Sequence, residues 1–307
     1  MTKKAKRDFI AITDFSESEI RETIKLAIDT KKKRQRLDVL AGKTVGCIFH
    51  KASLRTRISF EVGIYELGGY SLYITEKEIE LGKRESIHDA AKVLSRYLSM
   101  IEIRTFAHND VEQLAHHADI PIINGLTDLL HPCQVMSDMQ TIVEHKGKID
   151  GMKVAYLGDG NNMANSWLKA ATRMPFDLRI GTNKDTPPDA KILDEAKAAK
   201  KSKILVTDDP DEAVVNADVI YTDVWASMGQ KHLQEEKQRQ LAGFQVNSKL
   251  LNKAHDEAIV MHCLPANRGQ EITDEIMDGP QSVVFDQAEN RLHMQKAIMI
   301  KLAHDSF

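Results

Sequence analysis

The chain has 307 residues, of which 42% are hydrophobic and 28% are charged, and its formal net charge is −3. These values describe a soluble globular protein long enough for two domains, and they exclude a disordered, fibrous or membrane-spanning chain. The nearly balanced charge argues against a broad nucleic-acid-binding surface, so any basic site must be local.

The first half of the chain alternates between predicted helices and strands. Its N-terminus, Met-Thr-Lys-Lys-Ala-Lys-Arg, lacks the apolar core of a signal peptide, so a cytoplasmic protein is expected. A first helix is predicted after Ser16, because Glu19 completes a capping box and apolar residues then recur at helical spacing. Next come a buried strand at 44–49 and a helix from Ser53 to Gly68-Gly69. Strands are expected at 70–74, 99–103 and 121–123, with helices at 87–97, 110–118 and 132–145.

A second series of strands follows the turn at 148–151. It is expected at 153–157, 177–180, 203–206, 219–221, 258–261 and 282–285, before a terminal helix at 287–304. Such alternation indicates parallel sheets with crossover helices. The sequence therefore predicts an α/β protein with two doubly wound parallel-sheet domains, hinged near 140–150, and a cleft between them.

The strongest local signal for chemistry is Ser53-Leu54-Arg55-Thr56-Arg57, where a buried strand turns into a helix. A helix N-terminus offers unpaired N–H groups and partial positive charge, and hydroxyl and guanidinium groups add to both. The segment therefore predicts an oxyanion site. The alternative is a capped helix whose arginines point into solvent.

Two further segments are expected at the same edge of the first sheet. Arg104-Thr105 ends a strand, and His131-Pro132-Cys133-Gln134 precedes a helix. They would add a cation, an imidazole and an amide to the anion site. Each of these segments is a weak indication of a site when taken alone, since an isolated histidine is more often structural. The pair His116-His117 is interpreted as part of the surface.

The second half has its own candidates at strand ends. Gly158-Asp159-Gly160-Asn161-Asn162-Met163 fails the dinucleotide fingerprint at its third glycine, so no nicotinamide cofactor is expected. Asp223 opens a loop rich in small residues, although it could simply cap the next helix. His262-Cys263-Leu264-Pro265 places a thiol at the strand end, and a small buried apolar thiol is the alternative. The three cysteines, Cys47, Cys133 and Cys263, are too scattered for a disulfide framework or a paired-cysteine metal site.

Taken in this order, the segments resemble the aspartate/ornithine carbamoyltransferase family. The matching segments are 53–61, Arg104-Thr105, 131–134, 223–230, 262–265 and Gln287-Ala288-Glu289-Asn290-Arg291. The segments Ser227-Met228-Gly229 and His262-Cys263-Leu264-Pro265 are similar to those of the ornithine-using members.

The resemblance implies transfer of a carbamoyl group from carbamoyl phosphate to the side-chain amine of L-ornithine, giving citrulline and phosphate, without cofactor or metal. By analogy, the residues that hold carbamoyl phosphate would be Ser53, Leu54, Arg55, Thr56, Arg57, Arg104, His131, Gln134 and Arg291. Ornithine would contact Asn162, Asp223, Ser227, Met228, Cys263 and Leu264. The residues expected to act in catalysis are Arg104, His131, Gln134, Asp223 and Cys263.

The resemblance also implies a domain assignment and an assembly. Residues 1–140 and 288–307 would bind carbamoyl phosphate, and residues 150–287 would bind ornithine. A homotrimer, or a multiple of trimers, is expected, with the loop at Glu80 reaching a neighbouring subunit's site. Neither nucleic acid nor membrane is an expected partner.

Two positions depart from the family pattern. Glu80 stands where glutamine is usual, and Asn267 stands where ornithine enzymes commonly carry histidine. They leave two alternatives open: a carbamoyltransferase for another amine, such as putrescine or an N-acyl-ornithine, or a non-catalytic paralogue that binds carbamoyl phosphate.

Overall fold

The computed structural model describes residues 6–33, 37–226 and 234–306. The chain divides into two compact units. Unit 1 comprises Met1–Gln140 and Glu289–Phe307, and unit 2 comprises Thr141–Ala288. The chain passes from one unit to the other twice, within helix α6 (Pro132–Lys146) and within helix α13 (Val284–Ser306).

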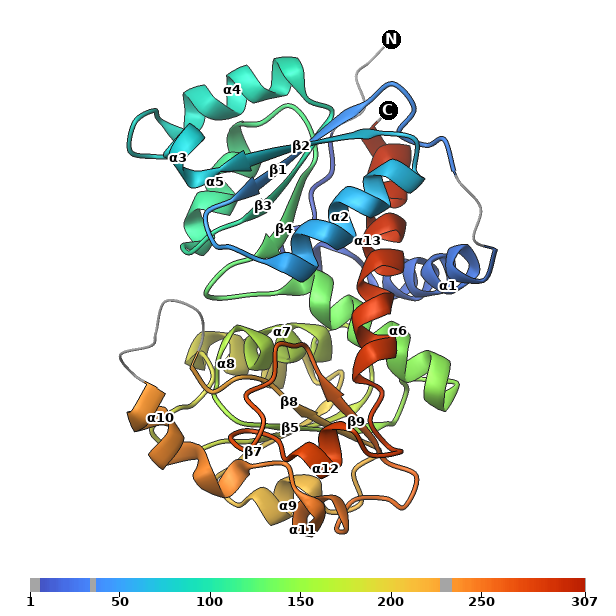
Figure 1. Ribbon diagram of the computed structural model, residues 1–307, viewed down its shortest axis with the longest axis vertical. Coiled ribbons are helices and arrows are strands. Elements are labelled where there is room, and N and C mark those ends of the chain that lie inside the picture. Colours follow the sequence, from blue (N-terminus) through green and yellow to red (C-terminus); the bar gives the residue numbers. More distant parts are fainter. Residues whose placement is uncertain (1–5, 34–36, 227–233, 307) are drawn as a thin grey trace. The chain divides into compact units, whose positions relative to one another are not determined.

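Unit 1 is built on a parallel sheet with strand order β2-β1-β3-β4. The strands are β1 (Thr44–Phe49), β2 (Tyr70–Thr75), β3 (Met100–Arg104) and β4 (Ile122–Leu126). Their crossover helices are α2 (Leu54–Glu66), α3 (Glu76–Ile79), α4 (Ile87–Tyr97) and α5 (His108–His117). Helix α2 covers one face of the sheet, and α4 and α5 cover the other (Figure 1). The strands and helices predicted for this half are confirmed, with shifts of a few residues at their ends.

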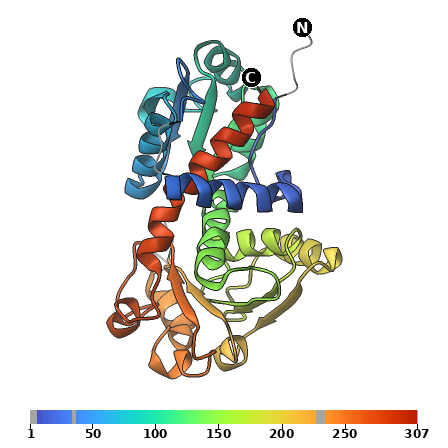
Figure 2. The same cartoon turned by 90° about the vertical axis from the view of Figure 1, so that its right-hand side faces the viewer.

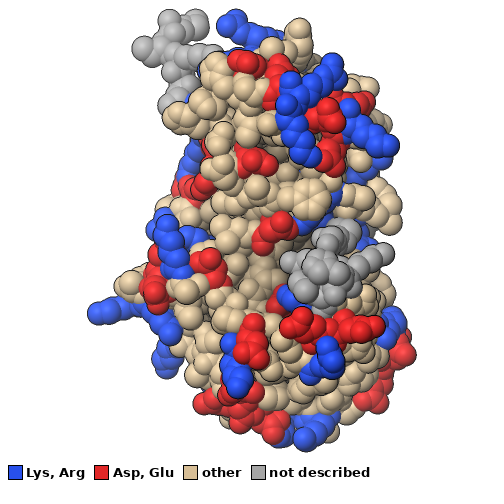
Figure 3. Space-filling view, turned by 90° about the vertical axis from the view of Figure 1, so that its left-hand side faces the viewer, with Lys and Arg blue, Asp and Glu red and all other residues tan. Residues whose placement is uncertain are grey.

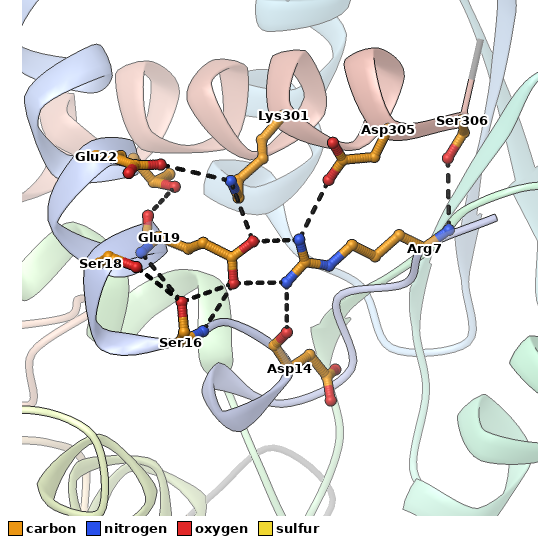
Figure 4. A network of polar contacts seen from close by, with 10 residues as sticks. Arg7, Asp14, Ser16, Ser18, Glu19, Glu22, Lys301, Asp305 and Ser306 are labelled. Carbon is orange, nitrogen blue, oxygen red and sulfur yellow. Dashed lines mark hydrogen bonds and ion pairs between the residues drawn. The ribbon is translucent and has the colours of Figure 1, made fainter. Parts of the chain in front are cut away.

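The first and last described segments of the chain meet in unit 1. The 3₁₀ turn Ile12–Asp14 leads into α1 (Glu17–Lys33), which crosses the terminal helix α13 (Val284–Ser306) in Figure 2. Arg7 donates to Glu19 of α1 at 2.7 Å and to Asp305 of α13 at 3.2 Å, and Lys301 pairs with Glu19 at 3.3 Å (Figure 4). The Arg7 guanidinium holds the pKa of Glu19 well below its usual value. This ion-pair network joins the start of the described chain to its last helix.

A glutamate without a hydrogen-bond partner among the described residues lies in the core of unit 1. Glu102 of β3 is fully buried, and neither carboxyl oxygen has a hydrogen-bond partner within the described residues. A Cβ at position 125 would lie 1.8 Å from its Oε1, so Gly125 leaves the room that this side chain occupies. Burial raises the pKa of Glu102 well above its usual value, although Arg104 and Arg291 act against it.

Replacing Glu102 by glutamine should therefore stabilise the protein, and more so as the pH rises. Because the folded-state pKa is raised, the wild type loses stability as pH rises above the unfolded pKa, by up to about 1.4 kcal/mol per pH unit. The neutral amide has no such slope. Urea unfolding at pH 6 and pH 8 measures the difference, with exposed Glu85→Gln as the control. An equal pH slope in Glu102→Gln and the wild type would contradict this account.

Unit 2 is built on a second parallel sheet, with strand order β7-β6-β5-β8-β9. Its strands are β5 (Lys153–Leu157), β6 (Asp177–Gly181), β7 (Lys203–Thr207), β8 (Val219–Thr222) and β9 (Ile259–His262). Its helices are α7 (Asn162–Ala171), α8 (Ala190–Ala199), α9 (Pro210–Val214), α10 (Gln234–Leu241), α11 (Ser248–Leu251) and α12 (Asp274–Met277). Helices α7 and α8 lie on one face, and α9, α11 and α12 on the other (Figure 1).

The strand predicted at 282–285 is wrong. Ser282 forms only an isolated bridge with Val260, and α13 already begins at Val284. Val283 and Val284 favour a strand by their branching, but both are buried, Val284 in the core of unit 2, so packing overrides propensity. The two parallel α/β sheets themselves are confirmed, whereas the cleft stays a prediction.

The surface carries both signs of charge. On the face in Figure 3, Lys and Arg side chains are interspersed with Asp and Glu side chains. Within residues 6–33, 37–226 and 234–306, no helix is long and apolar enough to cross a membrane.

Candidate functional site

The topology singles out one position in each sheet. In unit 1 the chain leaves β1 toward β2 on one side, and β3 lies on its other side. In unit 2 the same change of direction occurs between β5 and β8. Ligands of doubly wound sheets bind at the carboxyl ends of the strands at such switch points. The predicted segments 53–57 and 104–105 follow β1 and β3, and 158–163 and 223 follow β5 and β8.

A compact cationic centre forms at the switch point of unit 1. Ser53 caps α2 by accepting a hydrogen bond from the Thr56 N–H at 3.2 Å. The buried Thr56 hydroxyl accepts from Arg291 at 2.6 Å and from Arg104 at 3.2 Å. Two buried guanidinium groups thus meet at a hydroxyl beside a helix N-terminus, an arrangement suited to an anion with several oxygens.

His131 lies in the electrostatic field of this centre. Burial lowers its pKa well below the usual value, and the positive charges of Arg291 and Arg104 lower it further. A neutral imidazole can donate one hydrogen bond and accept another. Gln134, the third residue of α6, is also fully buried.

The other predicted residues of the first half are placed differently. Leu54 is exposed and Arg55 is half-buried. Arg57 lies apart from the Thr56 group: its Nε donates to Glu61 at 2.9 Å, and its guanidinium lies 3.8 Å from the centre of the Tyr73 ring. Its part in phosphate binding stays a prediction.

The loop at Glu80 is exposed. Glu80 ends α3 in a left-handed conformation with φ 40°. Lys83, a cation in the same loop, pairs with Glu76 rather than with Glu80, at 3.4 Å. Its contact with a neighbouring subunit stays a prediction.

A second polar group forms at the switch point of unit 2. The Cys263 thiol donates to Asp223 Oδ1 at 2.9 Å, and Asn161 Nδ2 donates to Asp223 Oδ2 at 3.2 Å. Asn161 Oδ1 also caps α7, accepting from the Met163 N–H at 2.9 Å. Asp223 is therefore a buried acceptor that is held by the N-cap of α7 and by the segment after β9, and it orients the Cys263 thiol.

Sequence reasoning selected Asn162 and missed Asn161. Asn162 is the first residue of α7 and is buried, and Asn161, directly before it, donates to Asp223. The signal was available, because an asparagine before a helix that follows a strand is a typical N-cap. Leu264 adopts φ 58° and packs against the core of unit 2. Ser227 and Met228 lie outside the described residues.

A buried pair holds the segment that carries Cys263. His262 Nδ1 accepts from the Leu264 N–H at 2.9 Å, and His262 Nε2 donates to Glu271 at 3.0 Å, with both side chains fully buried. Glu271 also accepts from the Asn267 backbone N–H at 2.5 Å. Position 267 thus contacts the pair through its backbone rather than its side chain.

By distance alone, ligand atoms of Asp223, His262 and Cys263 could hold a metal, since they lie within 4.8 Å of one another. Both ring nitrogens of His262 already have hydrogen-bond partners, and the thiol is bonded to Asp223. These contacts give the donor set of a hydrogen-bonded group rather than that of a preformed metal site.

Two parallel α/β units, one with a buried cationic centre and one with an oriented carboxylate–thiol pair, are typical of an α/β enzyme with ligand sites at the strand ends. The model of the aspartate/ornithine carbamoyltransferase carbamoyl-phosphate-binding domain matches residues 7–144. The model of the same family's Asp/Orn-binding domain matches residues 150–302. The chain belongs to the aspartate/ornithine carbamoyltransferase family, which confirms the resemblance predicted from its motifs.

Individual relatives match this chain over nearly its whole length. An ornithine carbamoyltransferase of Syntrophus aciditrophicus is 50% identical over 96% of this chain and 98% of its own length. One of Thermococcus kodakarensis is 49% identical over 96% of both. The solved structure of ornithine carbamoyltransferase from Pyrococcus furiosus superimposes with a TM-score of 0.92 at 45% identity, covering 97% of each chain.

Proposed function

We propose that this protein transfers the carbamoyl group of carbamoyl phosphate to the side-chain amine of L-ornithine, releasing citrulline and phosphate. The observation that carries the proposal is the convergence of Arg104 and Arg291 on the Thr56 hydroxyl, beside the N-terminus of α2. The ornithine-specific names of relatives about 50% identical over almost the full length support the choice of amine.

Unit 1 supplies the groups for carbamoyl phosphate. The N-terminal N–H groups of α2, with Ser53, Arg55 and Arg57, bind the phosphate, whose charge grows as the bond to the carbamoyl carbon breaks. Arg104, Thr56 and neutral His131 donate hydrogen bonds to the carbonyl oxygen, where negative charge develops as the amine attacks. No covalent intermediate is needed.

Unit 2 supplies the groups for the amine. A lysine-like amine has a pKa of about 10.4, so presenting it neutral at pH 7 costs roughly 4–5 kcal/mol. Asp223 and Cys263 orient the amine, while Asn162 and Leu264, with Ser227 and Met228, contact the rest of ornithine. The departing phosphate takes up the proton that the amine releases.

Product formation with a panel of amines tests the proposal. Carbamoyl phosphate is supplied with ornithine, putrescine, N-acetylornithine or aspartate, and phosphate and ureido product are measured together, with Arg55→Ala as the blank. The expected result is turnover with ornithine. Turnover with another amine alone would assign that substrate instead, and carbamoyl-phosphate binding without any turnover would identify a non-catalytic paralogue.

We also propose a cytoplasmic homotrimer whose subunits meet through unit 1. An exposed apolar stripe runs along α2, next to the edge strand β2, which also exposes apolar side chains. We call this surface the α2–β2 face; its exposed residues are Leu54, Ile58, Val62, Tyr65, Tyr70 and Leu72. Exposed apolar patches of this kind mark protein–protein contacts, and a second copy of the chain is the proposed partner.

A charge on the α2–β2 face should break the assembly. Tyr65→Asp buries a carboxylate in the proposed interface, so it should sediment as a single 34.6 kDa chain while the wild type sediments at three times that mass or a multiple of it. Tyr97→Asp on α4 is the matched control, because Tyr97 is 74% exposed and Tyr65 68%. A wild type of single-chain mass, or a trimeric Tyr65→Asp, would contradict the proposal.

A further inference from the structure

Two side chains in the first turns of α6 form a fully buried pair. Gln134 and Asp138 are separated by one helical turn, and both are 0% exposed. Gln134 Nε2 donates a hydrogen bond to Asp138 Oδ1 at 2.8 Å. Neither the sequence motifs nor the proposed mechanism gives Asp138 a task.

The identity of the partner fixes the orientation of the amide. A glutamine side chain has an NH₂ donor and a carbonyl acceptor of nearly equal size, so either could face a neighbour. The structure places the NH₂ of Gln134 on Asp138 and its carbonyl away from it, and this is the only orientation that an ionised carboxylate allows, because it can only accept. Within the described residues, this buried Oε1 has no hydrogen-bond partner.

A buried carbonyl without a donor costs about 1–3 kcal/mol, which a ligand N–H can recover. Gln134 lies beside the cationic centre, since its backbone N–H donates to the His131 carbonyl at 3.2 Å and the His131 ring lies in the field of Arg104 and Arg291. A ligand at that centre that carries both an anion and an N–H group would satisfy Oε1.

We propose that Asp138 is a positioning residue that locks the Gln134 amide with its carbonyl toward the NH₂ group of carbamoyl phosphate. The inference rests on the proposed function and adds a source of specificity to it. An acyl phosphate with a methyl group in place of NH₂ offers no donor, so Oε1 stays unpaired when that ligand binds. Asp138 thereby selects carbamoyl over acetyl groups without touching the ligand.

Two stable phosphonates of equal shape test this role. Phosphonoacetamide carries the NH₂ group, and 2-oxopropylphosphonate carries a methyl group in its place. Titration calorimetry gives the ratio of their dissociation constants for wild type, Asp138→Leu and Asp138→Asn. A purely structural role for Asp138 would weaken both ligands equally and leave the ratio unchanged. Ser137→Ala, a buried substitution on the same helix, is the matched control.

The wild type should bind the amide at least about tenfold more tightly than the ketone, a difference of one buried hydrogen bond. In Asp138→Leu the ratio should fall to within about threefold, while the affinity for the ketone changes less than about twofold. Ser137→Ala should keep the wild-type ratio. A wild-type ratio in Asp138→Leu, or an equal loss for both ligands, would overturn the inference.

If Asp138→Leu does not fold, Asp138→Asn carries the test. An asparagine can accept or donate, so it holds Gln134 in either orientation, and the ratio should fall about two- to threefold. An unchanged ratio of dissociation constants in Asp138→Asn would overturn the inference about Asp138 and leave the proposed function intact. A wild type that binds neither phosphonate would instead count against the proposed function.

Discussion

Replacing Arg104 by methionine should lower kcat/KM for carbamoyl phosphate by about 10³-fold, the effect of removing one preorganised donor from a developing oxyanion. The Arg104 side chain is buried, and its guanidinium lies 3.2 Å from the Thr56 hydroxyl. Solvent therefore does not take over the role of this cation in the variant. Methionine keeps the length and apolar stem of the side chain. Steady-state kinetics with saturating ornithine, together with the melting temperature, measure the effect.

Two further variants make this result specific. Arg104→Lys keeps the charge but loses the planar fork, so it should lose most of the activity as well. Arg96→Met removes an exposed arginine from α4 and should match the wild type. A correctly folded Arg104→Met within threefold of wild-type kcat/KM would contradict the role proposed for the cationic centre.

Asp223→Asn should lower kcat/KM for ornithine by about 10²-fold, the effect of misplacing a reacting group by about 1 Å, because Asp223 orients the attacking amine. Asp223 accepts from the Cys263 thiol and from Asn161, and asparagine supplies neither the charge nor two acceptor oxygens. Carbamoyl-phosphate affinity should change less than twofold, because the groups proposed for that ligand belong to unit 1.

Measuring both kcat/KM for ornithine and the affinity for carbamoyl phosphate separates a role in binding ornithine from a general loss of structure. Asp208→Asn, an exposed substitution in the same unit, should leave both parameters unchanged. Cys263→Ala should impair turnover without abolishing it, because the thiol orients the amine and forms no covalent bond. A loss of carbamoyl-phosphate binding in Asp223→Asn equal to its loss of activity would argue against the assignment of Asp223 to the amine.

The cationic centre was the part of the site most accessible from sequence. Hydroxyl and guanidinium groups directly after a buried strand lie at a helix N-terminus by the geometry of parallel sheets, so Thr56 and Arg104 could be placed at one edge from local pattern alone. Arg291 is 235 positions from Thr56, and only the family resemblance brought it to the site. Its hydrogen bond depends on how α13 packs, which no local pattern encodes.

Each residue or segment that was predicted wrongly or overlooked has a physical explanation. Asn161 was passed over for its neighbour because the partner, Asp223, is 62 residues away in the chain. Asp138 looks like an ordinary polar helix residue, and only its complete burial reveals that it must have a partner. The segment 282–285 was predicted as a strand from its branched apolar residues, whereas burial at the start of α13 decided its conformation.

In the reaction proposed for this protein, one chain moves a carbamoyl group from phosphate to the side-chain amine of ornithine. The most direct measurement supplies ¹³C-labelled carbamoyl phosphate with ornithine and follows the carbon by NMR while phosphate is assayed. We expect the label to appear in the ureido carbon of citrulline, with one phosphate released for each citrulline formed. Phosphate release without a labelled ureido carbon, or no ornithine-dependent phosphate release at all, would contradict it.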